Sequence, residues 1–218
     1  MRIAQVSARF VIYSYVTLFL IISSYYFFDL IVAQYFAEVQ RGAVWQFFRA
    51  ITDSGEGFYW IVPTGLMYLF YRYFPLEALP FAGWFKRNRL VDMRNAGFIA
   101  LSALASGLTV NLLKLVFARY RPVEYFQSGN FGMTWFDHGF SVASFPSGHS
   151  ATAMGVAMAF ALLFPRLRYP FLFYGALVTF SRVVINKHYF SDVLAGGFVG
   201  IVVTIFIYQR YFKLPRKG

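Results

Sequence analysis

The sequence predicts an all-α integral membrane protein, a bundle of about six transmembrane helices with one amphipathic helix in the membrane interface. Of its 218 residues, 59% are hydrophobic and only 13% are charged, whereas soluble domains carry about 25% charged residues. Its 28 Phe and 16 Tyr suit lipid-facing surfaces and interfacial aromatic belts. Apolar runs close to the length that crosses a bilayer, about 20 residues, recur along the whole chain. Lipid is therefore the expected surrounding of this fold.

The apolar runs place the candidate spans. They cover roughly Phe10–Leu30, Gly57–Phe74, Ala96–Phe117, His149–Phe164, Tyr169–Ile185 and Tyr189–Tyr211. The first span follows two arginines, as a secretory signal does, but it is longer than a signal core of about 7–15 residues. We expect it to be a membrane anchor. We expect residues 1–218 to form a single membrane domain, with a motif-bearing core over about 96–212.

Two connections carry more than a simple loop. One helical face of residues 34–52 holds the apolar side chains Phe36, Val39, Ala43, Phe47 and Ala50. This spacing predicts an amphipathic helix that lies in the outer interface. Residues 75–95 mix aromatic side chains with lysine and arginine, which predicts an anchor against anionic lipid headgroups on the inner side.

The distribution of Lys and Arg orients the bundle, because cytoplasmic loops are enriched in both. One side of the predicted bundle holds Arg2, Arg9, Arg72, Lys86, Arg87, Arg89, Arg94, Arg166, Arg168, Arg210, Lys213, Arg216 and Lys217. The opposite side holds Arg41, Arg49, Lys114, Arg119, Arg121, Arg182 and Lys187. We expect the first side and both termini to be cytoplasmic. In a bacterium the protein would lie in the inner (plasma) membrane, with its other face in the periplasm.

The net charge and the lack of cysteine restrict the classes of partner and of chemistry that this chain can have. The formal net charge of +11 favours membrane lipids with anionic headgroups, or an anionic ligand. Nucleic acid is not expected, because the basic residues are scattered between apolar runs. The absence of cysteine excludes a disulfide framework, thiolate catalysis and a zinc–cysteine site. None of these features predicts the oligomeric state.

Cations end the third and fifth spans on the outward side. Lys114 and Arg121 are seven residues apart, so they share a face if the helix continues that far. Each alone could be an interfacial cation that snorkels to the membrane surface. Arg182 precedes His188 by six residues, and these two meet only if the helix breaks near Asn186.

The fourth and sixth spans open on chemically active residues. Ser147, Gly148 and His149 begin the fourth span, where unpaired backbone N–H groups favour an anion and Gly148 permits close approach. Alone, this stretch could be an ordinary serine cap. His188 and Asp192 are four residues apart, so the carboxylate can hold one imidazole nitrogen and leave the other free. Alone, that pair could be a local helix hydrogen bond.

Together these groups suit phosphoryl chemistry. Three cations with backbone donors match the spread negative charge of a phosphoryl group in transfer. Two imidazoles match a nucleophile and a proton donor. The acids expected near the site are Glu124, Asp137 and Asp192, which are too few and too scattered to hold magnesium. We therefore expect no metal and no other cofactor.

Three sequence blocks in this order resemble a known family. KLVFARYRP carries K-x6-R-P, FPSGHS carries P-S-G-H, and SRVVINKHYFSD carries S-R-x5-H-x3-D. They resemble the type-2 phosphatidic acid phosphatase superfamily, whose membrane branch comprises lipid phosphatases and which also includes soluble vanadium haloperoxidases. The match covers Lys114 to Asp192, and the predicted spans argue against a soluble haloperoxidase.

The resemblance implies a role for each motif residue. His188 would attack phosphorus and form a phosphohistidine, and Asp192 would orient and polarise it. His149 would protonate the leaving oxygen and then activate water. The phosphate oxygens would be bound by Lys114, Arg121, Arg182, Ser147 and Gly148. Glu124 and His138, in the outer loop 118–145, are possible substrate contacts, although both could equally be solvated loop residues.

The motifs leave the substrate and the acceptor open. Family members act on phosphatidic acid, phosphatidylglycerol phosphate, undecaprenyl diphosphate or lipid A, and all share these blocks. A phosphotransferase, in which a hydroxyl replaces water as acceptor, would carry the same residues. A non-enzymatic lipid-phosphate binder or transporter would need the cations but not both histidines with Asp192. The leading hypothesis is a lipid phosphate phosphatase at the outer face of the membrane.

Overall fold

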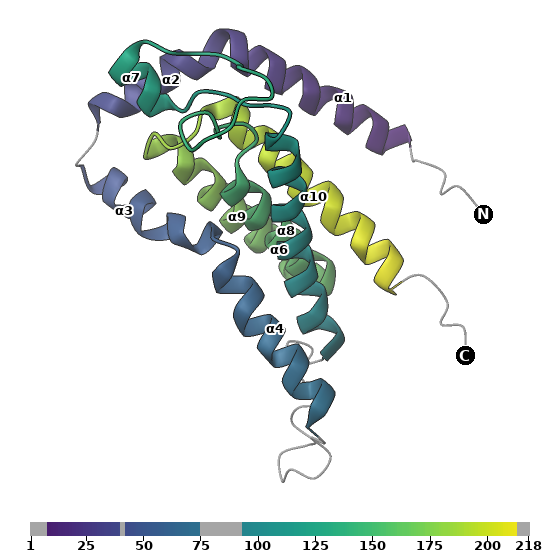
Figure 1. Cartoon of the computed structure of the whole chain (residues 1–218). Coiled ribbons are helices and arrows are strands. Elements are labelled where there is room, and N and C mark those ends of the chain that lie inside the picture. Colours follow the sequence, from purple (N-terminus) through teal and green to yellow (C-terminus); the bar gives the residue numbers. More distant parts are fainter. Residues whose placement is uncertain (1–7, 40–41, 75–92, 213–218) are drawn as a thin grey trace.

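A computed structural model describes residues 8–39, 42–74 and 93–212, and its regular elements in these ranges are helices (Figure 1). They are α1 (Ala8–Ser23), the π-helical segment η1 (Ser24–Phe28), α2 (Asp29–Glu38), α3 (Ala43–Ile51), η2 (Thr52–Gly55), α4 (Phe58–Tyr73), α6 (Met93–Lys114), α7 (Pro122–Ser128), α8 (Gly148–Leu163), η5 (Pro165–Leu167), α9 (Arg168–Val184) and α10 (Phe190–Phe212). The predicted all-α class is confirmed.

Among the described helices, three are long and apolar enough to cross a membrane: Phe10–Glu38, Arg94–Lys114 and Phe190–Arg210. The helix Gly148–Leu163 is apolar but shorter, while α4 has 16 residues and α9 has 17. The chain is an integral membrane protein, and the count of six spans stays a prediction. The first span was placed too short, because the helix continues from α1 through η1 to the end of α2.

Helix α8 is the centre of the bundle and packs against α6, α9 and α10. Small residues allow this close packing. A Cβ on Gly196 or Gly200 of α10 would lie closer than 3.0 Å to a backbone carbonyl oxygen of Ser147 or Ala151. The two glycines therefore let the backbone of α10 touch the start of α8, as small residues do between membrane helices.

The amphipathic helix predicted over 34–52 is wrong in its extent. Residues up to Glu38 belong to α2, and a new helix, α3, begins after Gly42, whose backbone is extended. Helix α3 has no buried residue in the described part of the chain, and Phe48 on it meets Phe180 of α9 edge to face, with ring centroids 5.7 Å apart. The predicted inner anchor over 75–95 falls almost wholly outside the described residues, and no described feature tests the membrane orientation.

The outer loop 118–145 folds over one end of the bundle (Figure 1). Helix α6 ends at Lys114, so the condition under which Lys114 and Arg121 would share a helical face is not met. The backbone leaves the helix because it pairs within the loop instead: the Arg119 N–H donates to Val142 O at 2.6 Å and the Arg121 N–H to Ser141 O at 2.9 Å. Pro122 then begins α7 at a position where a missing N–H costs nothing.

The glycine contacts between α8 and α10 predict a stability difference. Gly196→Ala and Gly200→Ala each force a methyl group against a backbone carbonyl, and overpacking of this kind costs about 1–3 kcal/mol or more. We expect both variants to melt several degrees below wild type in detergent. Gly65→Ala is the matched control, since a Cβ there meets nothing within 4 Å. Melting temperatures equal to that of the control would contradict the proposed packing.

Candidate active site

The ends of four helices bring the predicted motif residues together. His149 lies in the first turn of α8, Arg182 in the last turn of α9, and Lys114 at the end of α6. The charges that act on His149 come from Arg182, His188, Lys114 and Arg121. The three sequence blocks therefore form one cluster, although 78 positions separate its first and last residue, Lys114 and Asp192 (192 − 114).

His188 lies in the turn between α9 and α10 with 3% of its surface exposed. Its Nδ1 is 2.8 Å from the backbone carbonyl oxygen of Ser144, and a carbonyl only accepts, so Nδ1 carries the proton. Nε2, which has no hydrogen-bond partner among the described residues, is then the basic nitrogen. Burial lowers the pKa of His188 to about 4, against the opposing effect of Asp192. The imidazole is therefore neutral near pH 7.

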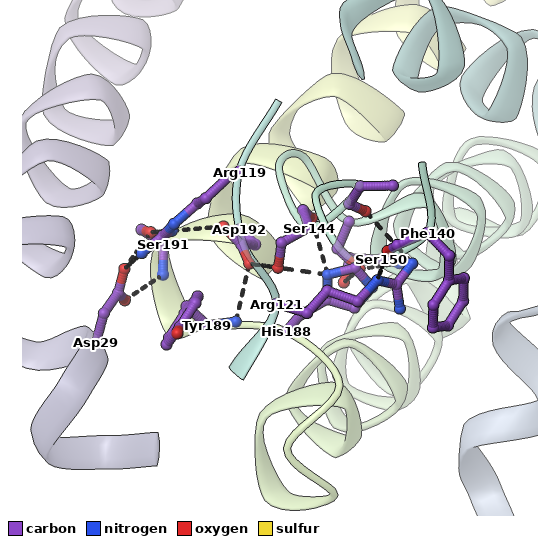
Figure 2. Close-up of polar contacts among 12 residues, drawn as sticks. Asp29, Arg119, Arg121, Phe140, Ser144, Ser150, His188, Tyr189, Ser191 and Asp192 are labelled. Atoms are coloured by element: carbon purple, nitrogen blue, oxygen red, sulfur yellow. Dashed lines mark hydrogen bonds and ion pairs between the residues drawn. The ribbon is translucent and has the colours of Figure 1, made fainter. Parts of the chain in front are cut away.

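Asp192 acts on His188 from a distance. Its Oδ2 is 3.8 Å from His188 Nδ1, too far for a hydrogen bond. The same oxygen accepts bonds from the Ser144 hydroxyl at 2.6 Å and from the Tyr189 N–H at 2.9 Å. Ser144 thus stands between them, with its hydroxyl bound to Asp192 and its carbonyl to His188 (Figure 2). The orientation of His188 comes directly from Ser144, and Asp192 contributes negative charge.

The helix breaks between Arg182 and His188, as the six-residue spacing of these two residues predicted. Helix α9 ends at Val184, and Asn186 has a left-handed backbone with φ 54°. The Arg182 carbonyl accepts the N–H groups of Lys187 and His188 at 2.9 and 3.2 Å. The Arg182 side chain donates to Thr52 Oγ1 at 2.9 Å, which ties η2 to the site.

The residues at the start of α8 differ in their surroundings: one is buried and caps the helix, and the next two line a groove. Ser147 is fully buried, and its Oγ accepts from the N–H of Ser150 at 3.4 Å and from its hydroxyl at 2.9 Å. Its side chain therefore caps the helix. Gly148 and His149, by contrast, line a groove of about 380 Å³ between α4 and α6. His149 Nε2 lies 3.6 Å from Glu56 Oε1 at the same place.

Contacts within the outer loop hold the Arg121 side chain, whereas Glu124 and His138 of the same loop have no described bond to the motif histidines. Arg121 Nε donates to Phe140 O at 2.8 Å, and the guanidinium lies 4.0 Å from the centroid of the Phe140 ring. His138 is exposed, with its own N–H bonded to Asp137 at 2.7 Å. Glu124 lies in the first turn of α7. In the described part of the chain, neither His138 nor Glu124 has a hydrogen bond or ion pair with His149 or His188.

The structure adds a buried polar network that the sequence analysis missed. Arg119 is fully buried and forms ion pairs with Asp29 of α2 at 2.7 Å and with Asp192 at 2.6 Å (Figure 2). Ser191 bonds to both Arg119 and Asp29. A signal was present: Asp29 is the single acid in the predicted first span, and ionisable residues inside membrane spans are usually functional.

The expected set of acids near the site was also wrong. Asp29 and Glu56 lie there, from segments far from the motifs in sequence. Both belong to the part of the chain before the first motif, so motif spacing carries no information about them. Within the described residues, no group of three or more His, Asp or Glu side chains lies close enough to hold a metal ion.

Known proteins resemble this chain over its motif-bearing half. The lipid A 1-phosphatase of Rhizobium etli is 39% identical over 127 residues, which are 56% of this chain and 55% of the relative. Undecaprenyl-diphosphatase BcrC of Bacillus subtilis is 31% identical over 112 residues, 51% of this chain and 55% of the relative. The chain spans about half the length of the curated relatives it matches.

A solved structure and a family model complete the comparison. The crystal structure of Aquifex aeolicus LpxE matches with a TM-score of 0.58 and 18% identity, over 83% of this chain and 94% of that chain. At this identity the likeness shows a shared fold. The model of the PAP2 superfamily matches residues 95–216, a range that contains all three motifs and more than half of the chain. The chain therefore belongs to the PAP2 superfamily.

Proposed function

We propose that this chain is an integral-membrane phosphatase that hydrolyses a lipid phosphate through a phosphohistidine, without a metal. The observation that carries the proposal is the state of His188. Its Nδ1–H is fixed on the Ser144 carbonyl, which leaves Nε2 as the nucleophile, and the cations Arg121 and Arg182 act on it from nearby.

The cluster can perform the reaction in two balanced steps. First, the Nε2 lone pair of His188 forms a bond to phosphorus as the bond from phosphorus to the lipid oxygen breaks, and His149 gives that oxygen a proton. Second, water gives a proton to His149 and attacks phosphorus, the P–N bond breaks, and inorganic phosphate leaves. Lys114, Arg121 and Arg182 stabilise the negative charge on the phosphoryl oxygens throughout.

The groove beside His149 supports a lipid as the substrate. Its lining includes Phe58 and Ile61 of α4, Leu104 and Leu108 of α6, and His149. A mostly apolar lining with a few polar groups suits a lipid whose phosphate lies beside His149. Because two lipid A 1-phosphatases are 39% and 37% identical to this chain, we propose lipid A 1-phosphate as the first substrate to test.

A phosphate-release panel tests the activity. Purified wild-type protein is assayed on lipid A, phosphatidic acid, phosphatidylglycerol phosphate and undecaprenyl diphosphate, with and without a chelator. We expect release from at least one lipid, unchanged by the chelator. His188→Ala should abolish it, whereas Glu38→Gln, a change at an exposed residue at the end of α2, should not alter it. Turnover by a folded His188→Ala protein would sink the mechanism, and transfer of phosphate to a lipid hydroxyl without release would indicate a phosphotransferase.

Filling the groove tests the lipid path. Gly107 of α6 lines the groove, and a Cβ there meets only Thr152, at 4.0 Å, so Gly107→Leu can be accommodated at the backbone while its side chain fills the space. We expect a raised KM for a long-chain lipid phosphate and normal hydrolysis of a small soluble phosphate ester. Leu112→Trp, at an exposed position of the same helix, is the control. Equal effects on both substrates would refute a lipid-specific groove.

The neutral state of His188 predicts a stability change with pH. Its folded pKa of about 4 lies below the ordinary 6.5, so the unfolded chain takes up a proton first as pH falls. Stability from this residue is complete above pH 6.5 and is lost between pH 6.5 and 4, by roughly 3 kcal/mol. His188→Asn cannot titrate, and its melting temperature in detergent should fall less over that range than that of wild type. Parallel curves would show that His188 is not buried in its neutral form.

A further inference from the structure

Asp29 is a buried carboxylate to which the proposed reaction assigns no role. It lies in the N-terminal membrane helix, outside the residues that match the family model, and 1% of its surface is exposed. Its Oδ2 accepts from Arg119 Nη2 at 2.7 Å and from the Ser191 hydroxyl at 2.5 Å, and its Oδ1 accepts from the Ser191 N–H at 2.8 Å. A carboxylate that is buried so completely needs these partners to stay ionised.

Arg119 joins Asp29 to the catalytic end of α10. The two Nη atoms divide between two carboxylates, Nη2 on Asp29 and Nη1 on Asp192. The guanidinium is also enclosed by aromatic rings, with Tyr189 at 4.2 Å and Tyr25 at 4.7 Å from its Cζ to the ring centroids. Figure 2 shows the resulting line of contacts from Asp29 through Arg119 and Asp192 to Ser144 and His188. Ion pairs with Asp29 and Asp192 therefore hold the Arg119 guanidinium in place, and Arg119 in turn holds Asp192.

The net charge of Asp29, Arg119 and Asp192 affects the energy of the proposed transition state. Asp29, Arg119 and Asp192 together carry one net negative charge, whereas Arg119 and Asp192 alone would be neutral. His188 becomes positively charged when Nε2 bonds to phosphorus, and the nearby charges of Arg121 and Arg182 oppose that charge. A negative charge held beside His188 therefore stabilises the transition state, and buried charges interact more strongly than charges in water.

We propose that Asp29 is a positioning residue of the active site: by sharing Arg119 with Asp192, it holds Asp192 in place and keeps the set beside His188 negative. The inference builds on the proposed phosphohistidine reaction and adds a residue from the N-terminal helix to it. Asp29 touches neither His188 nor the phosphate-binding cations, so its contribution lies in the rate of the phosphoryl step and not in phosphate binding.

The test compares Asp29→Asn, which removes the charge at constant shape, with Asp29→Glu, which retains it. Glu38→Gln, an exposed acid of the same helix, is the matched control. The measurements are the single-turnover rate of formation of the dephosphorylated lipid and the inhibition constant of inorganic phosphate. For Asp29→Asn we expect a rate loss on the order of tenfold to hundredfold with an unchanged inhibition constant, and for Asp29→Glu a partial recovery. A purely structural residue would lower the folded fraction without changing the rate per folded molecule.

The outcomes separate this inference from the proposed function. A wild-type protein without phosphatase activity refutes the function, whereas an active wild type with a folded, fully active Asp29→Asn variant overturns the role of Asp29 alone. A raised inhibition constant with an unchanged rate also overturns it. If Asp29→Asn does not fold, Ser191→Ala removes the hydroxyl that bonds to both Asp29 and Arg119 at constant charge, while the backbone N–H of residue 191 still bonds to Asp29. A folded Ser191→Ala protein with wild-type rate would then overturn the inference.

Discussion

Arg119 connects the parts of the molecule that the active site depends on. Its guanidinium binds Asp29 from the N-terminal helix and Asp192 from α10, and its backbone pairs with the outer loop at Val142 and Ser144. All three charged groups are buried, so none is stable without the others, and loss of one partner from such a set costs about 3–5 kcal/mol. Helix α2, the outer loop and α10 therefore take up their positions together.

Two kinds of contact surround the motif histidines. The Ser144 carbonyl accepts from the His188 ring, and the Ser144 hydroxyl donates to Asp192. Lys114, Arg121 and Arg182 lie close enough together that their like charges oppose one another. A bound phosphate relieves that repulsion, so the site favours an anion before any specific hydrogen bond is considered. In the proposed reaction, the hydrogen bonds that hold His188 and the cations that attract phosphate have complementary roles.

Helix positions predicted from the sequence pattern were confirmed where the structure of a segment depends mainly on its own residues. Helices α6, α8, α9 and α10 lie where apolar runs placed them, and the break near Asn186 follows from the spacing of Arg182 and His188. Pattern failed where distant segments compete for the backbone. Residues 118–121 leave the helix because backbone bonds to residues 132–144 replace helical ones. Apolar spacing over 34–52 did not reveal the break at Gly42.

Composition and short motif spacings are enough to predict the membrane class, the family and the motif residues, because they carry that information directly. The folded structure is needed to find what surrounds each motif residue. It showed that Ser144 and not Asp192 bonds to His188, that Ser147 caps a helix, and that Asp29 lies behind Asp192 through Arg119. These contacts join residues up to 162 positions apart, as between Asp29 and Ser191. Burial makes such partners obligatory for charged groups, but no local pattern says which segments will meet.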